Sequence, residues 1–198
     1  MEREEVRVLA LDQVRTLYAG RLTTDFPPDE VKSLAVIEGL LAQGRYLCYG
    51  YCAGGAVLAY AFFVCVDGEA LLDYFAVRED LRGRGVGGRF LRALMAGPLA
   101  GMRRALLEVD DPDFADDPEE RARRVRRLRF YLGRGMTDTG VRANVFCVDY
   151  RILAMPVGGE PDAREVRRVY AGIYRTTLPA ELYESMVRIG EDGGVTQG

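Results

Sequence analysis

A glycine-rich turn between an apolar segment and a helix-like segment is the part of this sequence best suited to chemistry. The apolar segment is Ala70–Val77, the turn runs from Arg82 to Gly88, and a helical pattern with Phe90 and Leu94 follows. Glycines at alternating positions let backbone N–H groups approach a diphosphate closely, and a helix start adds unpaired N–H groups and a favourable dipole. We therefore predict that this turn holds an anion.

The exact amino-acid sequence of the turn limits the ligands that it can be expected to bind. No Gly-Lys-Ser/Thr sequence ends it, which excludes the phosphate loop of nucleotide hydrolases, and the dinucleotide pattern GxGxxG is met only loosely. The turn does match Arg-x-x-Gly-x-Gly, at Arg82, Gly85 and Gly87, five residues beyond a strand ending at Val77. In this it resembles motif A of the GNAT family of acyl-CoA-dependent N-acetyltransferases. The alternative is a surface strand-turn-helix whose arginines serve solubility.

The resemblance implies acetyl-CoA as cosubstrate, with no metal, held by the backbone of two segments. One is the strand end, which would pair with the pantetheine arm like an added strand. The other is the turn, which would contact the pyrophosphate. The implied cofactor-binding residues are Phe75, Ala76 and Val77 for the arm, and Arg82, Gly83, Arg84, Gly85, Val86, Gly87 and Gly88 for the pyrophosphate. The alternative for the strand end is a plain core strand, and both can hold because the backbone does the binding.

Tyr131 is the candidate general acid. It lies in Phe130-Tyr131-Leu132-Gly133-Arg134-Gly135-Met136, which resembles the family's Tyr-x-x-x-Gly-Phe helix ending with Met136 in place of phenylalanine. In the family this tyrosine lies by the thioester sulfur, and a phenol of pKa about 10 is protonated at neutral pH and can donate to a thiolate. The alternative is an aromatic residue that packs on the core.

A carboxylate is needed to relieve the acceptor amine of its proton, directly or through water. Glu108 and Asp110 share one face of the predicted strand Arg104–Val109 at i and i+2. Glu108 is the first candidate, because a charge in an otherwise apolar strand is costly unless paired or used. Asp73 in the neighbouring strand is the second. The alternative is a carboxylate paired with an arginine.

One position departs from the family pattern. Many members carry an asparagine seven residues before the tyrosine, where this chain has Arg124 within a run of arginines. The departure affects the usual side-chain contact to the cofactor and leaves the backbone contacts untouched. The arginine run would either contact the cofactor's 3′-phosphate or form a solvated helix face.

Composition excludes several other kinds of chemistry. The chain has 198 residues, 48% of them hydrophobic, no histidine and four cysteines without a CxxC pair. The lack of histidine removes Ser-His-Asp and Cys-His catalysis and most zinc sites. The net charge of −3 argues against a nucleic-acid partner, and the longest apolar run, Ala56–Val66, is too short to cross a membrane. With no signal peptide before it, the chain is expected in the cytoplasm.

The coarse pattern of elements agrees with the resemblance over residues 3 to 156. Its order is β, α, α, β, β, β, α, β, α, β, β, with a basic helix at Pro118–Leu132 and a last strand pair at Val141–Val148 and Tyr150–Pro156. A second helix is expected to open at Pro27–Glu30 and to end at Gly44. We expect an α/β (α+β) GNAT fold: a mixed, mostly antiparallel sheet with a splayed, parallel central pair and flanking helices.

The end of the chain lies outside that pattern. Two helices, Asp162–Tyr174 and Pro179–Ile189, are expected, followed by a polar, frayed tail from Glu191. We therefore expect a GNAT acyl-CoA-binding domain at residues 1–157 and a helical extension at 158–198 packed on the same domain. The extension's tyrosines, at positions 170, 174 and 183, fit a homodimer contact or docking on the domain.

The leading functional prediction is an N-acetyltransferase (EC 2.3.1 type) that acts on an amine of a small molecule or peptide by direct attack on the thioester. A catalytically inactive acyl-CoA-binding sensor with the same fold is the alternative. Recognition of nucleic acid or acidic protein by the arginine helix is the third, disfavoured by the net charge. The acceptor is not readable from the sequence.

Overall fold

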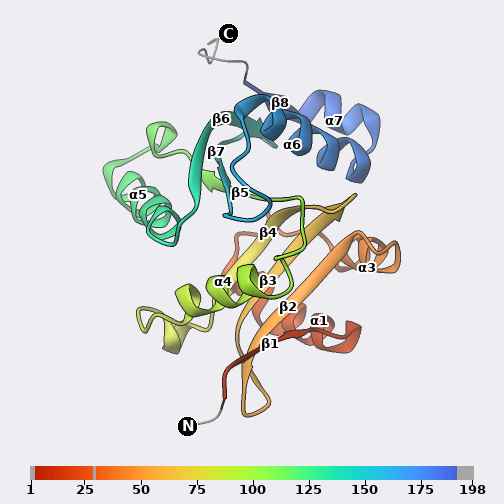
Figure 1. The fold of residues 1–198 in the computed structure, drawn as a ribbon, viewed down its shortest axis with the longest axis vertical. Coiled ribbons are helices and arrows are strands. Elements are labelled where there is room, and N and C mark those ends of the chain that lie inside the picture. The colour runs from red at the N-terminus through yellow and green to blue at the C-terminus, as the bar shows by residue number, and fades with distance from the viewer. Residues whose placement is uncertain (1–2, 29, 191–198) are drawn as a thin grey trace. The chain divides into compact units, whose positions relative to one another are not determined.

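The computed structural model describes residues 3–28 and 30–190. Their contacts divide the chain into two compact units, one of residues 1–65 and 72–94 and the other of residues 66–71 and 95–198. Figure 1 shows the elements of both.

The N-terminal unit contains the strands and short helical segments of the first part of the chain and the strand-turn-helix around the predicted anion site (Figure 1). Its elements are β1 (Glu5–Val8), α1 (Leu11–Leu17), the π-helical η1 (Tyr18–Leu22), α2 (Thr23–Asp25), α3 (Leu34–Ala42), β2 (Tyr46–Ala53), nearly all of β3 (Ala56–Val66), most of β4 (Glu69–Val77), the 3-10 turn η2 (Glu79–Leu81) and most of α4 (Val86–Ala96).

Antiparallel pairing of β1 with β2 and of β2 with β3 builds the sheet of this unit. The α4 side chain Phe90 stacks on Tyr51 and Phe75, with ring centroids 5.2 and 5.8 Å apart. Tyr74 instead contacts Phe26, from the segment after α2, edge to face at 5.0 Å. Aromatic side chains of β2 and β4 thus hold α4, and one of β4 holds the segment after α2.

The C-terminal unit contains the remaining strands and the long helices. Its elements are β5 (Arg104–Asp110), the 3-10 turn η3 (Pro112–Phe114), α5 (Pro118–Leu132), β6 (Thr137–Val145), β7 (Val148–Ala154), α6 (Ala163–Thr177), α7 (Ala180–Met186) and β8 (Val187–Ile189). The strands follow the order β5-β7-β6-β8, and each neighbouring pair is antiparallel.

The strand β4 contributes residues to both units. Its first residues, 69–71, group with the C-terminal unit, where the Arg103 N–H donates to the Gly68 carbonyl at 2.8 Å. The described strands form one mixed, mostly antiparallel sheet with one parallel pair and flanking helices. The predicted fold class is confirmed in these features.

Several predicted element boundaries were wrong. The turn between β6 and β7 is Phe146-Cys147, with φ of 49° and 66°, so the strands end and begin earlier than predicted. Val187–Ile189 is not the end of a helix but β8, in which Val187 pairs with Val145 of β6. The second helix begins at Leu34 and not near Pro27, because the Ser33 side chain caps it by accepting from the Val36 N–H. The predicted tail from Glu191 lies outside the described residues.

Candidate acyl-donor site and candidate catalytic residues

The turn after β4 has the backbone geometry that the sequence predicts. Gly83 and Gly85 adopt φ of +75° and +74°, a region that side chains other than glycine's rarely enter. The helix α4 begins at Val86, and the Arg89 N–H is bonded to the Gly85 carbonyl at 3.1 Å. The N–H groups at Val86, Gly87 and Gly88 therefore precede the helical hydrogen-bond ladder.

Arg82 fixes this turn to the rest of the N-terminal unit. Its Nε donates to the Val77 carbonyl at 3.1 Å, and its Nη2 lies 2.8 Å from Asp25 Oδ1. Asp25 also accepts from the Tyr60 hydroxyl at 2.9 Å. The Arg82 side chain thus ties the end of β4 to α2, and a diphosphate would meet the turn mainly through backbone N–H groups.

The residues predicted to contact the pantetheine arm form the end of β4. Ala76 is buried, whereas Phe75 and Val77 are half-buried. Stacking of Phe75 on Phe90 joins this strand end to α4. The predicted cofactor-binding residues, 75–77 and 82–88, therefore lie in one unit and on adjoining parts of one strand-turn-helix.

The turn also has the charge that a diphosphate requires. Arg84 is exposed in the turn, and its carbonyl accepts from Arg89 Nη1 at 3.1 Å. The Arg84 guanidinium beside unpaired N–H groups at the start of an 11-residue helix favours bound negative charge, whereas Arg82 and Arg89 are paired with Asp25 and Glu4. The residues present fit the pyrophosphate of coenzyme A.

Glu108 lies in the C-terminal unit, where two tyrosine hydroxyls contact its carboxylate. Glu108 Oε1 accepts from the Tyr174 hydroxyl at 2.7 Å and from the Tyr170 hydroxyl. Tyr170 is fully buried, and burial followed by the charge of Glu108 raises the pKa of its phenol well above 10. The carboxylate is thus held by two phenol hydroxyls, and that of Tyr170 stays protonated.

Sequence reasoning did not identify Tyr170 and Tyr174 as site residues. Both come from α6, whose apolar face also carries Val166, Val169 and Ile173. Their i, i+4 spacing places them on one side of that helix. The C-terminal tyrosines were interpreted as either a homodimer contact or docking on the domain. Tyr170 and Tyr174 contact Glu108 of their own unit, which is docking.

Tyr131, the candidate acid, ends α5 in the same unit as Glu108. Its side chain is buried, and burial raises the pKa of its phenol, although the nearby Arg127 opposes that rise. Arg127 Nη1 in turn lies 3.1 Å from Asp110 Oδ2. The phenol therefore carries its proton at neutral pH, as a general acid must.

The other two candidate bases are also paired. Asp110 contacts Arg127 of α5, whereas Glu108, two residues earlier on β5, contacts α6. Asp73 Oδ1 lies 2.6 Å from Nζ of Lys32, the chain's sole lysine, and Oδ2 accepts from the Tyr46 hydroxyl.

Arg124, which stands where many family members have asparagine, makes contacts within its own unit. Its Nη2 lies 2.5 Å from Glu120 Oε1, and its Nη1 donates to the Asp111 carbonyl at 3.0 Å and the Phe114 carbonyl at 3.3 Å. These bonds tie α5 to the turn η3 that follows β5. Arg124 thus has a structural role that needs no cofactor.

Among residues 3–28 and 30–190, no group of three or more His, Cys, Asp or Glu side chains is placed to hold a metal ion. No helix within the same ranges is long and apolar enough to span a membrane.

Comparison with known proteins places these features in a family. Residues 11–116, more than half of the chain, match the model of the acetyltransferase (GNAT) family. Bacillus subtilis (strain 168) YjbC, which is named as an acetyltransferase, is 32% identical over 111 residues. That match covers 56% of this chain and 52% of YjbC, so the chain spans about half the length of this curated relative.

Solved structures agree on the fold. A structure named as a GNAT-family acetyltransferase from Bacteroides thetaiotaomicron has a TM-score of 0.68 at 19% identity, over 87% of this chain and 96% of that one. The ribosomal-protein-S18-alanine N-acetyltransferase of Escherichia coli has a TM-score of 0.56 at 22% identity, over 81% and 98%. A Bacillus subtilis acetyltransferase in complex with CoA has a TM-score of 0.54 at 16% identity, over 77% and 98%.

Proposed function

Because this chain belongs to the GNAT family of acetyltransferases, we propose that it transfers an acetyl group from acetyl-CoA to an amine of a small molecule or peptide. The observation that supports the proposal is the turn 82–88, where two glycines with positive φ lead into the start of α4. We assign residues 75–77 to the pantetheine arm and residues 82–88 to the pyrophosphate.

The reaction is a direct attack without a covalent enzyme intermediate. The neutral amine nitrogen bonds to the thioester carbonyl carbon, the C–S bond breaks, and the electron pair leaves with sulfur. An alkyl amine of pKa about 10.4 is mostly protonated at pH 7, at a cost of about 4.6 kcal/mol. We assign removal of that proton to Glu108, directly or through water, and protonation of the leaving thiolate to Tyr131.

Residues 158–198 are, in this proposal, an addition to an acyl-CoA-binding domain at 1–157, and α6 supplies the hydroxyls that hold Glu108. We propose a cytoplasmic location, in keeping with the four free cysteine thiols. A nucleic-acid partner is not part of the proposal, given the net charge of −3.

One observation favours the alternative, an acyl-CoA-binding sensor without turnover. Both leading candidate bases, Glu108 and Asp73, are already hydrogen-bonded within the chain. A carboxylate that only stabilises the fold would have the same contacts.

Two measurements separate these functions. Isothermal titration calorimetry first establishes whether acetyl-CoA binds, and a CoA-release assay against a broad amine panel then follows turnover. Binding with release for at least one amine supports the enzyme. Binding without release for any amine supports the sensor, and absence of binding contradicts both.

A further inference from the structure

A cavity of about 280 Å³ lies in the C-terminal unit, apart from every residue assigned to acetyl transfer. Three distant chain segments line it: the start of β4, the start of β5, and the linker with the first turns of α6. The lining residues are Glu69, Arg103, Arg104, Gly158, Glu165 and Arg168. The cavity is thus formed at the residues that begin β4, whereas the acyl-donor turn follows the end of that strand.

The charges around the cavity do not balance. Three guanidinium groups face two carboxylates, and Glu69 is shared: its Oε1 lies 3.0 Å from Arg168 and 3.6 Å from Arg103. The Glu69 side chain is 8% exposed, whereas those of Arg103 and Arg168 are 63% and 61% exposed. Arg103 Nη2 also donates to the Asp67 carbonyl. Each guanidinium carries five N–H donors, so these acceptors can engage only some of the donors of the two arginines.

Arg104 adds a donor that the protein does not satisfy. Its Nη2 lies 2.8 Å from Glu165, and its Nη1 donates to the Gly158 and Arg103 carbonyls, which fixes the guanidinium in place. Its Nε is buried without a hydrogen-bond partner among the described residues. A buried donor left in this way is costly, and an acceptor oxygen from a ligand would remove the cost.

The linker at Gly158 is built closely around these arginines. Gly158 has φ of +69°, and a Cβ atom there would lie 1.9 Å from the Arg103 carbonyl oxygen. Glycine is therefore the residue that lets the linker close over the start of β5.

We propose that this cavity binds a small oxyanion, through a carboxylate or phosphate group held by Arg103, Arg104 and Arg168. Guanidinium groups are the side chains best matched to such oxygens, and three of them converge on one cavity with a net positive charge. The site takes its ligand independently of the proposed acetyl transfer.

Calorimetric titration of the full chain with inorganic phosphate and with succinate, at constant ionic strength in chloride, tests the proposal. We expect saturable binding of at least one of the two, with Arg168→Gln and Arg103→Gln each weakening it about tenfold or more. Glu69→Gln removes the competing carboxylate and should tighten binding.

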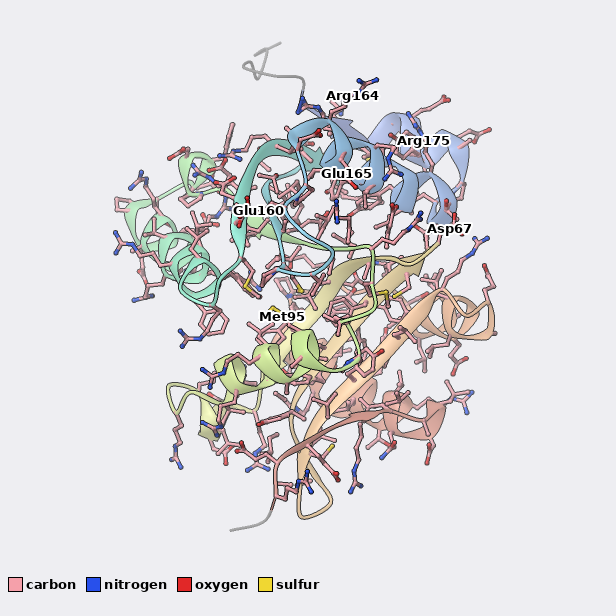
Figure 2. The ribbon with its side chains drawn as sticks, in the orientation of Figure 1. Asp67, Met95, Glu160, Arg164, Glu165 and Arg175 are labelled. Carbon is pink, nitrogen blue, oxygen red and sulfur yellow. The ribbon has the colours of Figure 1, made fainter. Side chains whose placement is uncertain are left out.

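Two matched variants locate the binding. Arg164→Gln removes the same charge from an exposed residue at the start of α6, next to Glu165, which Figure 2 labels beside it. Arg84→Gln removes it from the acyl-donor turn and reports anion binding at that turn. Arg164→Gln should bind as the unmodified chain does, to within about twofold. Absence of saturable binding for both anions overturns the proposal, and so does equal loss in Arg164→Gln. Loss confined to Arg84→Gln would place the anion in the donor turn and also overturn it.

Discussion

The Tyr174 hydroxyl lies 2.7 Å from Glu108 Oε1, the same carboxylate oxygen that accepts from Tyr170. A helix beyond the family match thus positions the carboxylate that we assign as the base. Donors on one oxygen restrict the rotamer of Glu108, and a general base works only when its geometry toward the proton is held.

Tyr174→Phe is expected to lower kcat/KM about tenfold and to leave the Kd of acetyl-CoA unchanged, because the lost hydroxyl holds the base and not the donor. Glu108→Gln should lower kcat/KM by about 10²-fold or more. Steady-state kinetics and calorimetry measure the two quantities. Tyr183→Phe, on α7, is the control and should match the unmodified chain; equal turnover in Tyr174→Phe would exclude a part for α6.

Asp73 is the second candidate base after Glu108. Its ion pair with Lys32 predicts that the Asp73 carboxylate stabilises the fold. The Asp73 and Lys32 side chains are 12% and 34% exposed, so Lys32→Met leaves a mostly buried carboxylate with a neutral partner. We expect a loss of about 2 kcal/mol in the free energy of unfolding, and Asp73→Asn in the same chain should recover part of it. Urea unfolding of the double-mutant cycle measures this.

The same variants test catalysis. Asp73→Asn alone should retain most of the turnover, in contrast with Glu108→Gln. The reverse order of the two rates would transfer the role of base to Asp73.

Tyr131 determines the alkaline behaviour of the reaction. Burial raises the pKa of its phenol above the ordinary value of about 10, so the acid form predominates up to at least about pH 9.5. We expect kcat/KM to rise from pH 7 to 9.5 without a descending limb. Tyr131→Phe should lower kcat by about 10²-fold or more with acetyl-CoA binding retained. A descending limb near pH 8 that Tyr131→Phe leaves in place would assign the proton to another group.

Glu4 connects the start of the chain to the helix that begins at the donor turn. Arg89 and the Tyr51 hydroxyl bond its carboxylate and lower its pKa to about 2. Because the pKa of Glu4 is lower in the folded chain than its unfolded value of 4.5, the ionised carboxylate stabilises the fold fully at pH values above 4.5. This contribution is lost as the pH falls from about 4.5 toward 2.

Glu4→Gln should therefore lower the free energy of unfolding by about 1 kcal/mol at pH 7 and by much less at pH 2.5. Urea unfolding at the two pH values checks this. Glu5→Gln, whose partner Arg7 is on the same strand, is the control and should show a smaller difference. The same loss at both pH values would contradict the assignment.

Elements with local signals were predictable. The helix α5 was predicted with its exact bounds, because Asp117 caps it and Pro118 begins it. The Phe146-Cys147 turn was not, since two residues with positive φ and no glycine give no turn signal. The strand β8 has three residues and depends on its pairing with β6.

The candidate site likewise has a part with local sequence signals and a part without them. The donor turn is continuous in sequence and has local glycine signals, so its geometry was predictable. The contacts of Glu108 come from residues 62 and 66 positions later in the chain, and no local pattern indicates such a pairing. The contact of Arg82 with Asp25 was not predictable either, because the two residues are 57 positions apart in the chain.

Two Gly83 variants that differ in charge alone test whether acetyl-CoA binds at the turn 82–88. Gly83 has φ of +75°, where any side chain is strained, but a Cβ atom there would meet nothing within 4 Å, so asparagine and aspartate should be strained to a similar extent. Calorimetry should show that the unmodified chain binds acetyl-CoA and that Gly83→Asn binds it somewhat less tightly. Gly83→Asp should bind acetyl-CoA at least about tenfold less tightly than Gly83→Asn, because the aspartate carboxylate repels the pyrophosphate. Equal affinities for the two variants, or no binding by the unmodified chain, would contradict the account.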